Sequence, residues 1–149
     1  MARSLDIETL IEDAFLTEIP NYVASTVEVK RWEDIKDQEL NPCVKIKATL
    51  TNQLVGTLNL FCAENVLVDI ATFTSKTQDE DGKAGNGIRG NIRELVNQDN
   101  IVTLLNAEPG LLVYKSGVIP QGASDLDDDK VWQKMLSVLV VATSTDPTP

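Results

Sequence analysis

The sequence contains no histidine among its 149 residues. Histidine is the one side chain that ordinarily titrates between pH 5 and 8, and it is the commonest metal ligand. The two cysteines and the many serines and threonines therefore have no histidine with which to form a nucleophile–base pair, and only lysine or carboxylate bases stay formally open. We expect a protein that is not an enzyme, with no catalytic residue.

Basic residues are also scarce, since 13 Lys and Arg face 23 Asp and Glu and give a net charge of −10. The excess is spread along the chain. Residues 1–75 carry 6 basic and 12 acidic side chains, and residues 76–149 carry 7 and 11. Binding to the phosphate backbone of nucleic acids requires clustered cations, so the composition disfavours it.

Long apolar runs are missing. The strongly apolar run at residues 136–142 is far shorter than the roughly 20 residues of a membrane helix. The first fifteen residues are rich in acids and contain no signal-like apolar segment. Cys43 and Cys62 lie in apolar alternating segments, where a thiol behaves as a small hydrophobe. We expect thiols in a reducing cytoplasm, with a disulfide between adjacent strands as the alternative.

The rest of the composition is that of a globular domain, with 42% apolar and 24% charged residues. A chain of this length removes enough surface from water to fold without a metal or disulfide. We expect one domain, residues 1–143, followed by a flexible tail, residues 144–149.

Apolar residues at helical spacing predict a first helix over residues 7–15, capped by Ser4 and ended by Pro20. The side chains of this apolar stripe are Ile7, Leu10, Ile11, Ala14 and Phe15. A second helical region begins near Ile88 and runs to Leu105, with a polar interruption at residues 97–100.

Alternating patterns predict strands, and residues 23–32 are either a further strand or an irregular piece. The expected strands are residues 43–51, 57–63, 65–74, 111–119 and 131–143. Residues 65–74 are apolar on both faces, which indicates a central strand. With too few helices for alternating crossovers, the order α-β-β-β-α-β-β predicts an α+β fold: a mostly antiparallel mixed sheet with two helices packed on one face.

A glycine-rich segment, residues 85–90 (GNGIRG), matches the dinucleotide fingerprint G-x-G-x-x-G. About ten polar residues separate it from the preceding strand, so a tight phosphate turn cannot form there. Asp79, Glu80 and Asp81 lie in this gap and would repel a phosphate. We therefore expect residues 75–91 to be a flexible loop, with no bound cofactor.

A second acidic segment follows, in which Asp125, Asp127 and Asp129 alternate as calcium ligands can. An EF-hand loop needs glycine at its sixth position and glutamate at its twelfth. Lys130 and Leu136 stand at those positions. The segment is predicted to be a solvated hairpin loop, residues 120–129, without a metal.

The order of elements resembles that of the small neck and tail-end proteins of tailed bacteriophages, most of all the tail terminator (tail-completion) proteins. The resemblance rests on an N-terminal amphipathic helix, a P-x-V-x-I strand (Pro42-Cys43-Val44-Lys45-Ile46), a helix at residues 88–96, and a final strand that contains Trp132. It covers about residues 4 to 143 and carries over no individual functional residue.

The resemblance implies a structural virion protein, assembled in the host cytoplasm, that forms a ring usually of six subunits. Such a ring caps the tail tube and joins it to the head–neck connector. The implied partners are other copies of the chain, the tail tube protein and a connector or stopper protein. DNA is only a transiting cargo, and no membrane is involved.

We expect the two acidic loops to lie at the lumen or the tube-facing rim of this ring, where negative charge prevents DNA from sticking. The candidate interaction residues are Asp79, Glu80, Asp81, Lys83, Arg89, Asp125, Asp127, Asp128 and Asp129. Four alternatives stay open: acids that only solvate the surface, another neck, stopper or tube-like component, a nucleotide-binding domain, and a small acidic binding module.

Overall fold

The computed structural model describes residues 6–32, 42–51, 64–119, 126–127 and 131–144. Its helices are α1 (Ile7–Glu18), the 3-10 turn η1 (Ile19–Asn21), α2 (Lys83–Val96) and α3 (Ile101–Leu105). Its strands are β1 (Glu28–Arg31), β2 (Cys43–Thr51), β3 (Glu64–Ser75), β4 (Leu111–Val118), β5 (Leu126–Asp127) and β6 (Val131–Ser144).

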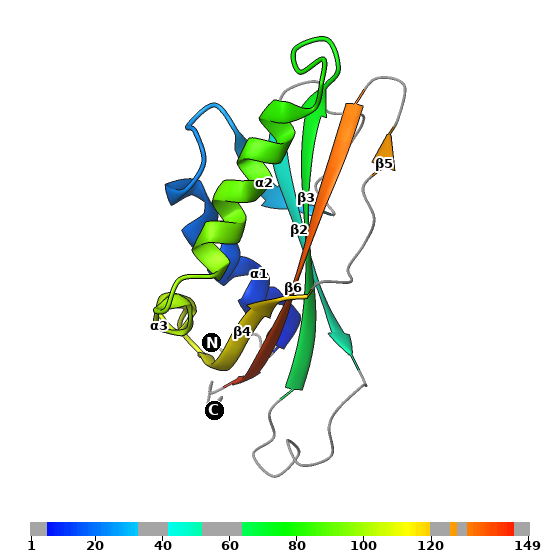
Figure 1. Cartoon of the computed structure of the whole chain (residues 1–149). Helices are drawn as coiled ribbons and strands as arrows, with labels where there is room; N and C mark the ends of the chain where they lie inside the picture. Colours follow the sequence, from blue (N-terminus) through cyan, green and yellow to red (C-terminus); the bar gives the residue numbers. More distant parts are fainter. Residues whose placement is uncertain (1–5, 33–41, 52–63, 120–125, 128–130, 145–149) are drawn as a thin grey trace.

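The strands form one curled sheet in the order β1-β2-β3-β6-β4, and the short β5 pairs with the start of β6. Only β1 and β2 run parallel, and every other pair is antiparallel. The helices pack on one face of this sheet (Figure 1). The predicted α+β class and the central position of β3, between β2 and β6, are therefore confirmed.

The core lies between the sheet and the helices. All five side chains of the predicted α1 stripe are buried, and Phe15 is completely enclosed. They share one hydrophobic cluster with every second residue of the three central strands, as the two-residue repeat of a strand requires. The buried sheet residues of this face are Val44, Ile46, Ala48, Val66, Val68, Ile70, Leu136, Val138, Val140 and Ala142.

Helix α1 begins at the predicted residue, Ile7, but its cap lies two residues after the predicted one. Asp6 is the N-cap, and its carboxylate accepts hydrogen bonds from the Glu8 N–H at 3.0 Å and the Thr9 hydroxyl at 2.8 Å. A short polar side chain at this position satisfies amides that the helix leaves open. Ser4, the expected cap, lies outside the described residues. Pro20 sits in η1 directly after α1, close to the predicted end.

The prediction of a flexible loop at residues 75–91 is wrong for its second half. Helix α2 begins at Lys83 rather than near Ile88, so the glycine-rich segment is helical. Ile92, Leu95 and Val96 bury one face of this helix against the sheet, which offsets the weak helix propensity of glycine. The expected polar interruption at residues 97–100 is confirmed, because α3 starts only at Ile101.

Other boundaries differ in smaller ways. Of residues 23–32, only Glu28–Arg31 form a strand. The predicted loop at 120–129 contains the two-residue strand β5, so it is not a loop throughout. The predicted strand 57–63, residues 33–41 before β2 and residues 145–149 of the tail lie outside the described residues.

The second face of the sheet is also partly covered. Lys45 is only 2% exposed, and its ammonium lies 4.9 Å from the centre of the Phe73 ring. Trp32 meets the same ring edge-on at 6.0 Å. Cys43 is buried nearby, and Cys62 lies outside the described residues.

Candidate interaction surface

The first acidic segment is anchored by Asp79, whose side chain is buried at 5% exposure. One carboxylate oxygen accepts the Ala84 N–H at 3.0 Å. The other accepts the Gly85 N–H at 3.0 Å and the Thr74 hydroxyl at 2.8 Å. Asp79 therefore fastens the end of β3 to the first turn of α2.

These contacts stabilise the ionised form of the Asp79 side chain. Burial by itself raises the pKa of the Asp79 carboxyl. The three hydrogen bonds and the charge of Lys134 lower that pKa by more, so it lies below the ordinary value of 3.8. The carboxylate is ionised at neutral pH and compensates the positive end of the helix dipole.

This arrangement also accounts for the dinucleotide-like motif. In the fingerprint, the backbone amides at the helix start face a pyrophosphate. Here the chain's own carboxylate already occupies the amides of Ala84 and Gly85. A Cβ atom on Gly85 would lie 3.1 Å from the Thr74 hydroxyl, so the first glycine of the motif serves close packing against β3.

Trp132, at the start of β6, connects this turn to the sheet. Its indole N–H donates to the Asp79 carbonyl oxygen at 2.8 Å. The ammonium groups of Lys76 and Lys134 lie 4.5 Å and 4.8 Å from its ring centre. Cations at these distances are attracted to the π-face of an indole.

The second acidic segment lies beside the same tryptophan, Trp132. Strand β5 pairs with β6 so that Asp127 is opposite Trp132 and Leu126 is opposite Gln133. The two acidic segments, separated by more than forty residues in the sequence, therefore share one end of the sheet (Figure 1). We name it the Trp132 end: residues 76–83, 126–127 and 131–134.

The other predicted residues of the first segment lie on the surface of this end. Glu80 and Asp81 are exposed. Asp81 accepts the Lys83 N–H at 3.1 Å, and its carboxylate lies 3.6 Å from the Lys83 ammonium. Both side chains of this ion pair are largely exposed, so it adds little stability.

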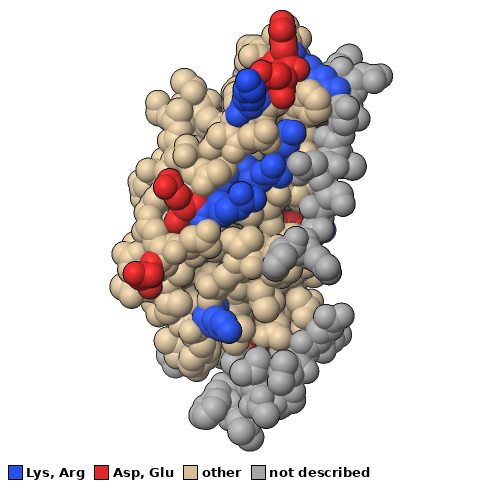
Figure 2. All heavy atoms as spheres, in the orientation of Figure 1, with Lys and Arg blue, Asp and Glu red and all other residues tan. Residues whose placement is uncertain are grey.

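Arg89 has a different place, one and a half turns into α2. Its guanidinium donates to the Met135 carbonyl oxygen at 3.2 Å and to the Asn86 side chain at 3.1 Å, so it ties α2 to β6. Figure 2 shows basic side chains in a diagonal line across the face that carries α2, and acidic and basic side chains together where α2 begins. The same view also shows acidic side chains farther down this face, so the acids are not confined to the end where α2 begins.

Asp125, Asp128 and Asp129 lie outside the described residues, so the structure places only Asp127 of the second segment. In the described part of the chain, no group of three acidic or cysteine side chains could hold a metal ion. Among the same residues, no helix is both long and apolar enough to cross a membrane.

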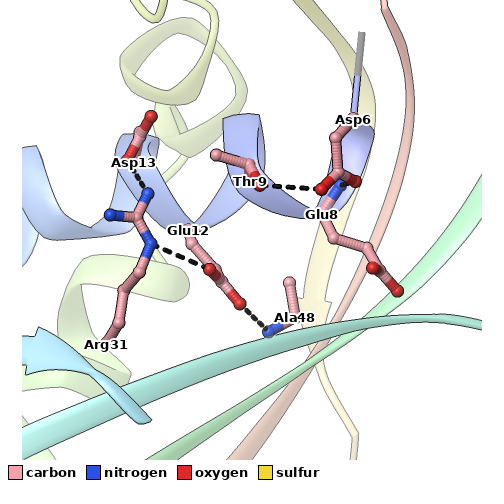
Figure 3. A network of polar contacts seen from close by, with 7 residues as sticks. All are labelled: Asp6, Glu8, Thr9, Glu12, Asp13, Arg31 and Ala48. Atoms are coloured by element: carbon pink, nitrogen blue, oxygen red, sulfur yellow. Dashed lines mark hydrogen bonds and ion pairs between the residues drawn. The ribbon is translucent and has the colours of Figure 1, made fainter. Parts of the chain in front are cut away.

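A second polar network closes one side of the sheet (Figure 3). Where β1 ends, the N–H of Ala48 donates to Glu12 at 2.9 Å, and that of Leu50 donates to Glu8 at 2.6 Å. The Arg31 guanidinium holds the Glu12 carboxylate at 3.0 Å and also pairs with Asp13. Glutamates from α1 thus satisfy backbone groups of β2 that the short β1 does not reach.

The chain matches no protein-family profile and no curated protein sequence.

Sequence reasoning did not identify Trp132 as the residue that joins the two acidic segments. The available signal was weak: a tryptophan in a charged stretch, with a lysine two residues beyond it. Sequence reasoning also did not identify Glu12, which is buried at 6% exposure although it is a glutamate outside the apolar stripe of α1.

Proposed function

We propose that the chain is a structural virion protein resembling a phage tail terminator. In this proposal, copies of the chain form a ring, with six as the expected number, that caps the tail tube and joins it to the head–neck connector. The observation that supports it most is the Trp132 end, where two acidic segments from distant parts of the sequence meet on one rim of the sheet.

The contacts of Asp79 limit which acidic side chains can act on a neighbouring molecule. Asp79 is buried in contacts within the chain, whereas Glu80 and Asp81 are exposed, so of the described acids of the first segment these two are available for an external role. A rim repeated around a ring multiplies this charge. Like charge at short range keeps DNA from adhering to the wall of a passage, and salt screens it beyond about 8–10 Å.

The proposal assigns no chemistry to the chain. Its partners are other copies, the tube protein and a connector or stopper protein, and the DNA only passes. The acids at the Trp132 end act through the field they create rather than through a bound ligand, so reversing their charge is the direct test.

The first test is assembly. Purified protein is incubated with purified tail tubes and imaged by negative-stain electron microscopy. We expect a ring with a central opening and density at one end of each tube. Polymerisation of the protein into tubes would assign it to a tube-like component instead. A stable one-to-one complex with a basic protein, with tube ends left bare, would indicate a small binding module and contradict the proposal.

The second test is charge reversal, with Glu80 and Asp81 both changed to Lys. The matched control changes the exposed Asp99, in the turn after α2, to Lys. In a complementation assay we expect normal tails with both proteins but reduced DNA ejection only with the double variant. Equal ejection from the two would contradict a role for the Trp132 end in DNA passage.

A further inference from the structure

Strand β4 lies at one edge of the sheet, and the direction of its backbone groups follows from the pairing. The Ile119 N–H donates to the Ser137 carbonyl oxygen at 2.9 Å, and Val118 is opposite Val138. Ile119 is therefore a hydrogen-bonded partner of β6. Because such pairs alternate along antiparallel strands, Gly117 also faces β6, and Ser116 and Val118 direct their N–H and C=O groups away from the sheet.

The first half of the same edge is closed by the chain itself. A β-bulge between Val113 and Lys115 changes the alternation, so that Leu111 and Val113 point outward there. The Leu111 N–H donates to the Glu108 carbonyl oxygen at 3.2 Å. The side-chain amide of Asn106 accepts the Val113 N–H at 2.6 Å and donates to the Val113 carbonyl oxygen at 3.5 Å.

The outward backbone groups of Ser116 and Val118 therefore form an open edge. Elsewhere the fold covers such groups, as Glu8 and Glu12 do for β2. Within the described part of the chain, no hydrogen bond reaches the outward groups of Ser116 and Val118, and such a pair on a sheet edge is a template for another strand.

We propose that the open edge of β4 pairs with the same edge of a second copy of this chain, antiparallel, about a two-fold axis through Gly117. Ser116 then lies opposite Val118 of the second copy, and Val118 lies opposite its Ser116. Each of these two pairs exchanges both backbone hydrogen bonds, so four bonds form. Because one inward residue separates the two outward residues, the edge of one copy is complementary to the same edge of a second copy.

Gly117 fits the axis of this contact. Two residues that face each other on the axis form a non-hydrogen-bonded pair, whose Cα atoms approach to about 4.5 Å. A Cβ atom on Gly117 would meet no described residue within 4 Å, so packing against this part of the chain does not require a glycine there. Without a side chain at this point, the backbones of the two copies can approach closely, and this gives Gly117 a role.

Charge also favours a second copy at this place. In a chain of net charge −10, the strand sequence LLVYKSGV contains one lysine and no acid. In the proposed register Lys115 lies opposite Ile119 of the second copy, so the cations do not meet. The exposed Leu112 (37%) and Tyr114 (48%) lie on the same strand beside the contact.

The test is a cross-link in a chain with Cys62 changed to Ser. Gly117→Cys places two thiols across the axis at a separation that suits a disulfide. The matched control is Lys115→Cys, two residues away on the same strand, whose thiols would be about 13 Å apart. After mild oxidation, we expect at least tenfold more covalent dimer with Gly117→Cys on a non-reducing gel. Equal yields, or dimer only with Lys115→Cys, would overturn the proposal.

A second variant tests the hydrogen bonds. Ser116→Pro removes an outward N–H and leaves the pairing of β4 with β6 intact. Sedimentation equilibrium should show a dimer of the unaltered chain whose dissociation constant rises at least tenfold in the variant, with an unchanged far-UV circular dichroism spectrum. A folded variant that dimerises as tightly as the unaltered chain would overturn the proposal, as would an unaltered chain that stays monomeric. This two-fold pairing is a different contact from the one that would join neighbours around the proposed ring, so loss of the dimer and failure to bind tail tubes are separate results.

Discussion

At the scale of single residues, Asp79 is a buried charged side chain that joins β3, α2 and β6. Its two oxygens accept three hydrogen bonds, and its backbone carbonyl accepts a fourth from Trp132. A charged acceptor bonded to backbone amides forms hydrogen bonds about twice as strong as neutral ones. The cost of losing the charge is correspondingly large, because the buried Gly85 amide would be left without an equal partner.

Changing Asp79 to Asn tests this role. We expect a loss of about 1–3 kcal/mol in the free energy of unfolding at pH 7, because the amide nitrogen of asparagine cannot accept these bonds. Urea denaturation followed by circular dichroism measures the loss. The control is Asp81→Asn, whose side chain is exposed and should cost less than about 0.5 kcal/mol.

We also expect the stability of the Asp79→Asn variant to depend less on acid pH than that of the unaltered chain. Because the folded-state pKa of Asp79 lies below its ordinary value of 3.8, its stabilisation is present above that value and is lost as the pH falls through the folded-state pKa. Between pH 5 and pH 2 the stability of the Asp79→Asn variant should therefore fall less steeply than that of the unaltered chain. Parallel curves would contradict this role of the carboxylate.

At the scale of elements, α2 combines glycines of two kinds. Gly85 packs closely, since a Cβ atom there would meet Thr74 at 3.1 Å and Lys134 at 3.3 Å. Gly87 and Gly90 face open space. A glycine inside a helix costs about 0.5–1 kcal/mol relative to alanine, so only the first has a structural reason within the chain.

The three glycines should therefore respond differently to alanine. We expect Gly87→Ala and Gly90→Ala each to raise the free energy of unfolding by about 0.5–1 kcal/mol. Gly85→Ala should lower it, because the β3 hydroxyl and the first turn of α2 would have to separate. Thermal denaturation of the three variants and the unaltered chain measures these changes in stability. Stabilisation by all three substitutions would contradict the close packing at Gly85.

A second prediction at this scale concerns the closed side of β2. Changing both Glu8 and Glu12 to Ala leaves the Ala48 and Leu50 N–H groups open beside Leu50, which is 41% exposed. Open edges with apolar neighbours associate, so we expect light scattering to rise with protein concentration. Glu18→Ala, at the last residue of the same helix, is the control and should leave the scattering unchanged.

How far the sequence predicted these elements depended on the kind of interaction. The strands β2 and β3 were predictable because alternation of residues such as Val66, Val68 and Ile70 is a local pattern that burial preserves. The start of α2 was not, because its anchor is a carboxylate five and six residues before the amides that it binds. A usual cap acts over two or three residues and can be read locally.

The candidate site divides in the same way. The acidic character of its segments was evident in the sequence, and their meeting was not, because it depends on the register of β5 against β6. Two paired residues have no periodicity from which a strand can be inferred. The outward direction of Ser116 and Val118 was equally hidden, since it depends on a one-residue bulge.

At the scale of the whole molecule, the described helices and strands share one core. The hydrophobic cluster runs from Ile7 of α1 through the sheet to Leu105 of α3 and Ala142 of β6. Contacts link α1 to β2, α2 to β6 and α3 to β4, so each helix packs on the same sheet. Such an arrangement favours unfolding in a single cooperative step.

Phe15→Ala tests this cooperativity. Phe15 is fully buried in α1, and its truncation should cost about 3–5 kcal/mol, a large part of the roughly 5–15 kcal/mol of a natural domain. Tryptophan fluorescence and far-UV circular dichroism should shift to the same lower urea midpoint. If the fluorescence midpoint stayed in place while the helical signal moved, α1 would unfold separately from the sheet.

The contact between α1 and β2 sets limits on where the chain can change length. Four helical residues advance about 6 Å and two strand residues about 6.6 Å, so Glu12 and Glu8 come into step with Ala48 and Leu50 as the two elements run in opposite directions. One residue inserted between positions 8 and 12 would turn one carboxylate away by about 100°. Insertions and deletions accepted during evolution should therefore fall in the connecting segments and leave the spacings 8–12 and 48–50 unchanged.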